Sequence, residues 1–182
     1  MRAIQSLPRI WLVSDARNDS MLESALTRLP RESGFIFRHY HLAPQDRFAR
    51  FLDLRRAARV CGHTVILADS AQTAREWGAD GIYGAARSLA PRRRDILQLA
   101  TAHSLREIGE ANRMGADAVL LSPAFPTRSH PGAPALGPVP FRLMATHARM
   151  PVIALGGMSA ARARALHWPR WAAIDGLTAS IP

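Results

Sequence analysis

The chain contains 182 residues, 48% of them hydrophobic, which suits one globular domain with a single core and is short for two. No apolar run approaches the roughly 20 residues needed to cross a bilayer, and the single cysteine, Cys61, excludes an internal disulfide. The formal net charge is +10, but no recognition motif accompanies the basic residues, so we expect no specific nucleic-acid binding.

The types of basic residue present exclude one class of catalytic mechanism. All 24 are arginine, and without a lysine side chain no catalytic Schiff base can form. Only Arg92–Arg94 form a run, which we expect on a surface loop. The segment Met1–Pro8 lacks the continuous apolar core and cleavage site of a signal peptide, so we expect a cytoplasmic protein.

Short apolar runs alternate with longer helical patterns along the chain, which is typical of a parallel α/β fold. Most of these runs are continuous β-branched or aliphatic stretches, as expected of strands covered on both faces. The alternation predicts one (β/α)₈ TIM barrel over residues 1–182, with the last helix short or missing. The strands are predicted at Ile10–Ser14, Gly34–Tyr40, Thr64–Asp69, Gly81–Tyr83, Ile96–Ala102, Ala118–Ser122, Val152–Leu155 and Ala172–Ile174.

Several helices have clear start and stop signals. Serine caps begin three of them, glycines end three, and Ser104 with Glu107 forms a capping box. The helices are predicted at Gln45–Cys61, Ser70–Trp77, Ser104–Met114 and Ser159–His167.

Two strand ends carry the strongest functional signal. The run Ala118–Leu121 opens into Ser122–His130, a loop rich in proline and hydroxyl groups, and Val152–Leu155 ends in Gly156-Gly157. Hydroxyl groups donate hydrogen bonds to anionic oxygens, and paired glycines let the backbone approach a ligand closely. In a (β/α)₈ barrel such loops form a phosphate pocket on the C-terminal face.

The chain resembles thiamine phosphate synthases and the related thiazole tautomerases of thiamine biosynthesis. The resemblance covers about Ile10 to Ser180 and is most specific in the Pro-x-Phe-Pro-Thr phrase and the Gly-Gly that follows it. The segments that carry it are Asp15, Arg38, Leu67–Asp69, Gly78–Gly81, Ala102–Ser104, Ser122–Thr127 and Ile153–Met158.

The resemblance implies a ligand site on the upper face of the barrel, which takes small phosphorylated thiazole and pyrimidine molecules. Synthases join a thiazole phosphate to a pyrimidine pyrophosphate with the help of Mg²⁺. By position, the thiazole phosphate would contact Gly156, Gly157, Ile174 and Asp175. The pyrimidine and pyrophosphate would contact Arg38, Thr127, Ser129 and His130, and a metal would bind Asp69.

Departures from the synthase pattern weaken the expected pyrophosphate site. The second metal carboxylate falls near Ser88, and two lysines are replaced by Tyr40 and His130. A magnesium–pyrophosphate site needs two or more hard oxygen ligands and several cationic donors. We therefore expect Mg²⁺ only if the chain is a synthase, and we expect little synthase activity.

His103, at the end of the fifth predicted strand, matches the histidine that moves a proton in thiazole tautomerases. Imidazole gains and loses a proton near neutral pH, which suits this task. The prediction is a tautomerase-like protein; a synthase, a non-catalytic binder of the same ligands and an unrelated phosphate-binding isomerase stay open. So do simple capping roles for His103, Asp69 and Asp175, and a homo-oligomer is possible. His39 and His41 lack an evident third ligand, so we expect no metal there.

Overall fold

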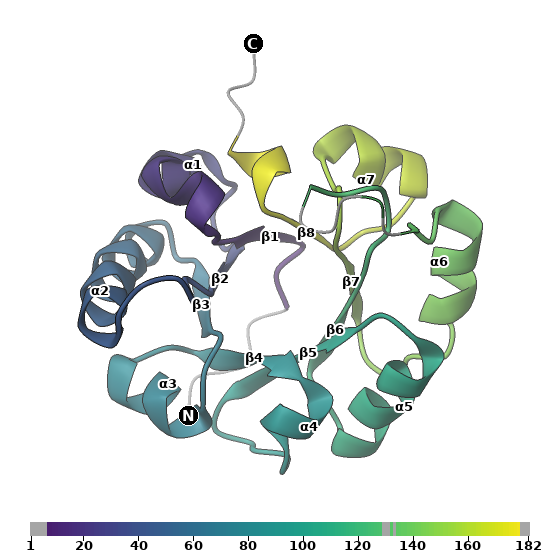
Figure 1. Cartoon of the computed structure of the whole chain (residues 1–182), viewed down its shortest axis with the longest axis horizontal. Helices are drawn as coiled ribbons and strands as arrows, with labels where there is room; N and C mark the ends of the chain where they lie inside the picture. The colour runs from purple at the N-terminus through teal and green to yellow at the C-terminus, as the bar shows by residue number, and fades with distance from the viewer. Residues whose placement is uncertain (1–6, 129–131, 133, 179–182) are drawn as a thin grey trace.

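The computed structural model describes residues 7–128, 132 and 134–178, and these form a closed barrel of parallel strands in the order β1 to β8. Helices ring the strands on the outside (Figure 1). The predicted (β/α)₈ fold is confirmed. The strands are β1 (Ile10–Val13), β2 (Gly34–Phe37), β3 (Thr64–Leu67), β4 (Gly81–Ala85), β5 (Leu97–Ala102), β6 (Ala118–Leu121), β7 (Val152–Ala154) and β8 (Trp171–Ala173).

Strand β2 ends three residues before its predicted end at Tyr40. His39 has φ = 38°, in the left-handed region and outside the extended range of a regular strand. Arg38 therefore lies in the turn after β2 rather than inside the strand.

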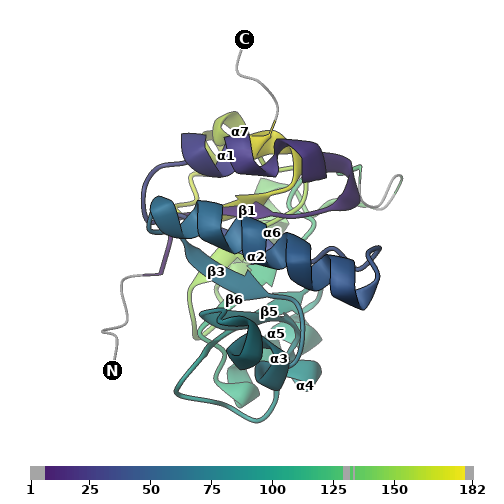
Figure 2. The ribbon, with the colours of Figure 1, turned by 90° about the vertical axis from the view of Figure 1, so that its left-hand side faces the viewer.

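The four predicted helices are all present, and Figure 2 shows α1, α2 and α3 crossing one side of the barrel in succession. The expected short last helix is a single 3₁₀ turn, η2. The helical elements are η1 (Ala16–Met21), α1 (Leu22–Arg28), α2 (Pro44–Val60), α3 (Ala71–Trp77), α4 (Ala86–Leu89), α5 (Leu105–Met114), α6 (Pro138–Ala145), α7 (Ala160–Leu166) and η2 (Asp175–Leu177).

Hydroxyl caps and left-handed glycines set the predicted helix ends. Ser70, Ser104 and Ser159 each accept a hydrogen bond from a backbone amide in the first turn of α3, α5 and α7. Gly78 and Gly115 adopt φ near 73° and end α3 and α5.

No bounds were predicted for four further helical elements, η1, α1, α4 and α6. In α1 the buried residues Leu22, Ala25 and Leu26 follow helical spacing, which is a signal for this element. Asp15 caps the preceding η1, so the polar segment after β1 is helical rather than a loop.

Two apolar layers make the core. Alternate strand residues such as Trp11 and Val13 form the cluster inside the barrel, while Leu12 packs in the layer between strands and helices. Gly34 leaves room for the Trp11 ring, because a Cβ there would lie 2.0 Å from the ring carbon Cε3.

Two further observations concern a surface loop and the helices. Arg92–Arg94 lie in the surface loop between α4 and β5, where Arg92 pairs with Asp117 at 2.6 Å. Across the residues that the structure describes, no helix has both the length and the apolar content needed to cross a membrane.

Candidate functional site

A pocket of about 890 Å³ lies at the carboxyl ends of the strands, between the loops that follow them. Its volume falls within the roughly 300–1,000 Å³ that small-molecule sites occupy. It brings together most of the site residues predicted from the sequence. Those that line it are Arg38, His103, Thr127, Gly156, Gly157, Ile174 and Asp175.

Three predicted residues are not in that set. Ser129 and His130 lie outside the described residues. Asp69 lies two residues beyond the end of β3, and among the described residues that line the pocket it does not appear.

The loops after β6 and β7 pack tightly against each other on one wall of the pocket. The Ala124 amide donates to the Leu155 carbonyl at 2.8 Å, and the Phe125 amide donates to the Gly156 carbonyl at 3.1 Å. A Cβ on Gly157, whose φ is 59°, would lie 2.3 Å from the Pro126 carbonyl oxygen. The missing side chain therefore makes room for the neighbouring loop, although Gly157 also lines the pocket.

The imidazole of His103 is held by the end of β6. Its Nδ1 lies 3.0 Å from the Ser122 carbonyl oxygen and 3.2 Å from the Ser122 hydroxyl. Because a carbonyl only accepts hydrogen bonds, Nδ1 carries a proton when it bonds to that oxygen. In the neutral ring this leaves Nε2 unprotonated, so it can accept a proton from a ligand.

Arg38 is anchored to the end of β1. Its amide donates to the Ser14 hydroxyl at 2.8 Å, its Nε donates to the Ser14 carbonyl at 3.0 Å, and its Nη2 pairs with Asp15 at 2.7 Å. Burial alone would raise the pKa of Asp15, but contacts with Arg17 and with Arg38 lower it. The guanidinium is therefore held in a fixed orientation at the pocket wall.

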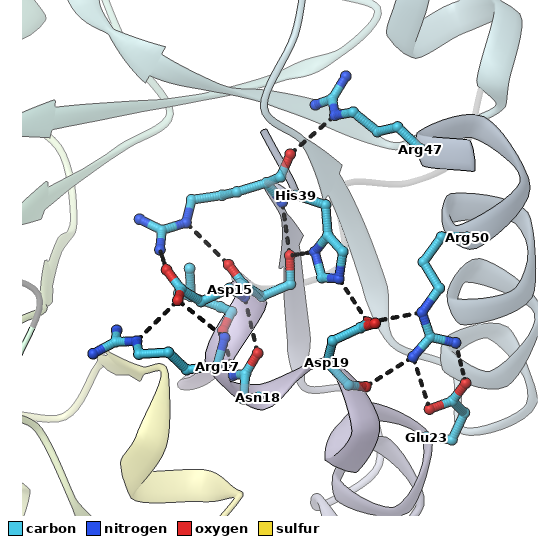
Figure 3. A network of polar contacts seen from close by, with 11 residues as sticks. Asp15, Arg17, Asn18, Asp19, Glu23, His39, Arg47 and Arg50 are labelled. Atoms are coloured by element: carbon cyan, nitrogen blue, oxygen red, sulfur yellow. Dashed lines mark hydrogen bonds and ion pairs between the residues drawn. The ribbon is translucent and has the colours of Figure 1, made fainter. Parts of the chain in front are cut away.

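A polar network around the buried Ser14 and His39 supports this anchor (Figure 3). His39 contacts the Ser14 hydroxyl through Nδ1 at 2.7 Å and Asp19 through Nε2 at 2.7 Å. Asp19 also accepts from Arg50 at 2.8 Å, and Arg50 pairs with Glu23. The network joins the ends of β1 and β2 to η1, α1 and α2.

The pocket lining also includes residues that were not predicted as site residues, among them Tyr83, Arg128 and Arg162. Tyr83, in the middle of β4, belongs to the inner barrel cluster, and burial raises its pKa. Together with Arg38, the two arginines outnumber Asp175, the carboxylate among the described lining residues. The pocket is therefore suited to an anionic ligand.

The surroundings of Asp69 do not fit a Mg²⁺ site. One carboxylate oxygen accepts from the Ser70 amide at 2.7 Å and the other pairs with Arg47 at 2.6 Å. Mg²⁺ binds one or two carboxylates together with water and phosphate oxygens. Within the described part of the chain, no group of three or more histidine, cysteine, aspartate or glutamate residues could hold a metal ion.

Comparison with known proteins agrees with the predicted family. A family model described as thiamine monophosphate synthase matches residues 10–174. A thiamine-phosphate synthase from Chloroflexus aurantiacus is 32% identical over 133 residues, which is 70% of this chain and 62% of that protein. A relative from Aquifex aeolicus is 41% identical over 59 residues, 32% of each chain. The chain thus spans less than two thirds of the length of these curated relatives.

Solved structures share the fold. A thiamine phosphate pyrophosphorylase from Pyrococcus furiosus superposes with a TM-score of 0.77 at 22% identity, covering 94% of this chain and 88% of that one. FabK from Thermotoga maritima gives a TM-score of 0.71 at 17% identity, covering 96% of this chain and 60% of that one. At these identities the likeness concerns the barrel alone. The match of the family model over nearly the whole barrel shows that this chain belongs to the thiamine monophosphate synthase family.

Proposed function

We propose that the protein binds a thiazole phosphate in the pocket and isomerises it by proton transfer at His103. The observation that carries this proposal is the His103 imidazole, which lines the pocket and hydrogen-bonds to Ser122 through Nδ1. A tautomerisation removes a proton from one ring position and returns a proton to another. One imidazole can perform both transfers, so no other reactant is consumed.

A phosphate anchor at the ends of β7 and β8 is a second feature that supports the proposal. The loops after β7 and β8 lie against each other there, since a Cβ on Gly176 would stand 2.1 Å from the Met158 carbonyl oxygen. Both loops line the pocket through Gly157 and Ile174, and the Arg162 guanidinium lies beside them. Backbone amides and one guanidinium in this arrangement suit a phosphate monoester.

A second candidate function is thiamine phosphate synthesis from a pyrimidine pyrophosphate and a thiazole phosphate. The name of the Chloroflexus aurantiacus relative favours it. The ion pair between Asp69 and Arg47 argues against it, because that carboxylate would have to release a guanidinium before it could bind Mg²⁺. Ser88, which follows β4 where the synthase pattern has the second metal carboxylate, offers no negative charge.

The test is to incubate the purified protein with the non-aromatic tautomer of the thiazole phosphate and follow its conversion by NMR. We expect turnover in the wild type and a loss of about 10²- to 10⁴-fold in His103→Gln, the usual contribution of one general acid–base group. His147→Gln is the control, because the exposed His147 is absent from the pocket lining.

The alternatives give different results in the same preparation. Formation of thiamine phosphate that depends on Mg²⁺ and both substrates would make the protein a synthase. Calorimetric binding of the thiazole phosphate without turnover in either assay would make it a non-catalytic binder.

A further inference from the structure

A cation from the chain itself already lies against Asp69. The three guanidinium nitrogens of Arg47 each donate to an oxygen: Nη1 to the Asp69 carboxylate at 2.6 Å, and Nη2 to the Ala68 carbonyl at 3.0 Å. The third, Nε, donates to the Arg38 carbonyl at 3.0 Å. A carboxylate and two carbonyls are hard oxygen donors of the kind that ligate Mg²⁺ or Ca²⁺. In this protein they converge on a guanidinium.

Aromatic rings surround the same guanidinium. The Cζ atom of Arg47 lies 5.6 Å from the ring centre of Phe37, 5.8 Å from that of Tyr40 and 5.5 Å from that of Trp77. Arginine stacks favourably on aromatic faces. Mg²⁺ usually keeps several waters, which such rings cannot hydrogen-bond well. The Arg47 side chain is only 11% exposed, so it occupies the position beside these oxygens that a hydrated metal ion would need.

We propose that Arg47 is a fixed substitute for a divalent cation at the end of β3 and that it excludes Mg²⁺ from Asp69. The guanidinium reaches this position from α2, so the neutralising charge is part of the fold. The proposal goes beyond the function proposed above and does not rest on it, because it concerns the partner of Asp69 whatever ligand the pocket takes.

The state of the carboxylate agrees with this assignment. Burial would raise the pKa of Asp69, but the hydrogen bond from the Ser70 amide and the contact with Arg47 lower it. The carboxylate is therefore ionised at neutral pH, and its charge is balanced by the arginine.

The test uses Mn²⁺ as the probe, because electron paramagnetic resonance distinguishes bound from free Mn²⁺. We expect no bound Mn²⁺ in the wild-type protein and no difference between the wild type and Asp69→Asn. Arg47→Met keeps an apolar stem among the rings but releases the oxygens. We expect this variant to gain Mn²⁺ binding, and we expect the further change Asp69→Asn to remove it.

A matched control lies on the same helix. Arg59 pairs with Asp80 at 2.7 Å, so Arg59→Met also takes a guanidinium from one aspartate. Asp80 precedes β4 and so lies at the opposite end of the barrel from Asp69. We expect no Mn²⁺ binding in this control, with folding of every variant checked by circular dichroism.

Three results would overturn the proposal. The first is Mn²⁺ binding by the wild type that Asp69→Asn abolishes. The second is a folded Arg47→Met protein that binds no Mn²⁺, and the third is equal binding by Arg59→Met. The comparison of the wild type with Asp69→Asn needs no change at Arg47, so it remains decisive if Arg47→Met does not fold.

Discussion

The Ser14 hydroxyl lies 2.7 Å from Nδ1 of His39, and both side chains are removed from solvent. Because the Ser14 oxygen accepts the Arg38 amide, its own proton is available to His39 Nδ1. The opposite nitrogen, Nε2, then carries the ring proton and donates it to Asp19. The hydrogen bonds from Ser14 to His39 to Asp19 resemble those of a hydrolytic triad, but the buried Ser14 is absent from the described lining of the pocket. It therefore positions Arg38 rather than attacking a ligand.

The neutral state of His39 predicts a stability that falls in mild acid. Burial lowers the pKa of His39, and the hydrogen bond to Asp19 opposes part of this shift. The unfolded chain therefore binds a proton below about pH 6.5 that the folded chain resists. Stability from this group is present above pH 6.5 and is lost as the pH falls through the lower, folded-state pKa. Asp19, His41 and Arg50 are the charged or titratable groups that face the ring.

Urea unfolding between pH 8 and pH 5 tests this prediction. We expect the wild-type free energy of unfolding to decline below about pH 6.5. In His39→Gln, we expect a loss of roughly 1–3 kcal/mol at neutral pH, from the broken hydrogen bonds, and a flatter profile. His147→Gln, at an exposed site, should keep the wild-type profile. Equal slopes in all three proteins would show that His39 is not responsible.

The strands could be predicted because continuous apolar runs mark them locally, and every predicted strand is present. The end of β2 could not, since Ile36–Tyr40 has the composition of a strand and the turn depends on the left-handed φ of His39. In this backbone conformation the His39 side chain hydrogen-bonds to Ser14 and Asp19.

The sequence allowed site residues to be predicted where strand ends carry unusual residues, such as His103 and Gly156. The partners of those residues had no local signal. Arg47 lies 22 positions before Asp69 on a helix whose other arginines look alike in the sequence. Only the fold shows that one of these arginines pairs with Asp69, the carboxylate that was expected to bind a metal.

The close packing of Gly34 against Trp11 predicts that one methyl group added at position 34 disrupts the barrel interior. Gly34→Ala would place Cβ 2.0 Å from the ring of Trp11, which is fully buried. Overpacking of this kind costs about 3 kcal/mol. Gly84→Ala, in strand β4, meets only Leu89 at 3.7 Å and should change the free energy of unfolding by less than about 0.5 kcal/mol. Similar stabilities for the two variants in urea unfolding would contradict this account.

The tight packing at Gly157 predicts a larger effect than its backbone angle alone. Gly157→Ala would combine a φ of 59° with a Cβ placed 2.3 Å from the Pro126 carbonyl oxygen. Gly115→Ala is the control, because Gly115 has φ = 72° and ψ = 44° and a Cβ there would meet only the Arg92 Cδ atom, at 3.9 Å. We expect about 1–2 kcal/mol of strain in the control and a greater loss in Gly157→Ala, together with weaker binding of the thiazole phosphate in calorimetry. Equal losses would mean that the neighbouring loop moves aside freely.

The position of Arg162 predicts a specific contribution to anion binding. Its guanidinium donates to the Gly157 carbonyl and lies 5.3 Å from the Phe125 ring centre, so it is held beside the proposed phosphate site. Arg164 lies on the same helix but does not appear among the described residues that line the pocket. The two substitutions Arg162→Gln and Arg164→Gln change the net charge equally, which separates a contact from a general attraction.

We expect Arg162→Gln to weaken binding of the thiazole phosphate, measured by calorimetry, by about 10- to 100-fold, the range for one charge-assisted hydrogen bond. Arg164→Gln should bind the ligand as the wild type does at physiological salt, because solvent ions screen an exposed charge that does not touch the ligand. Equal weakening in both variants would mean that the pocket attracts the ligand only through its overall field. No weakening in either would place the phosphate away from Gly157, on the side of the pocket formed by Arg38.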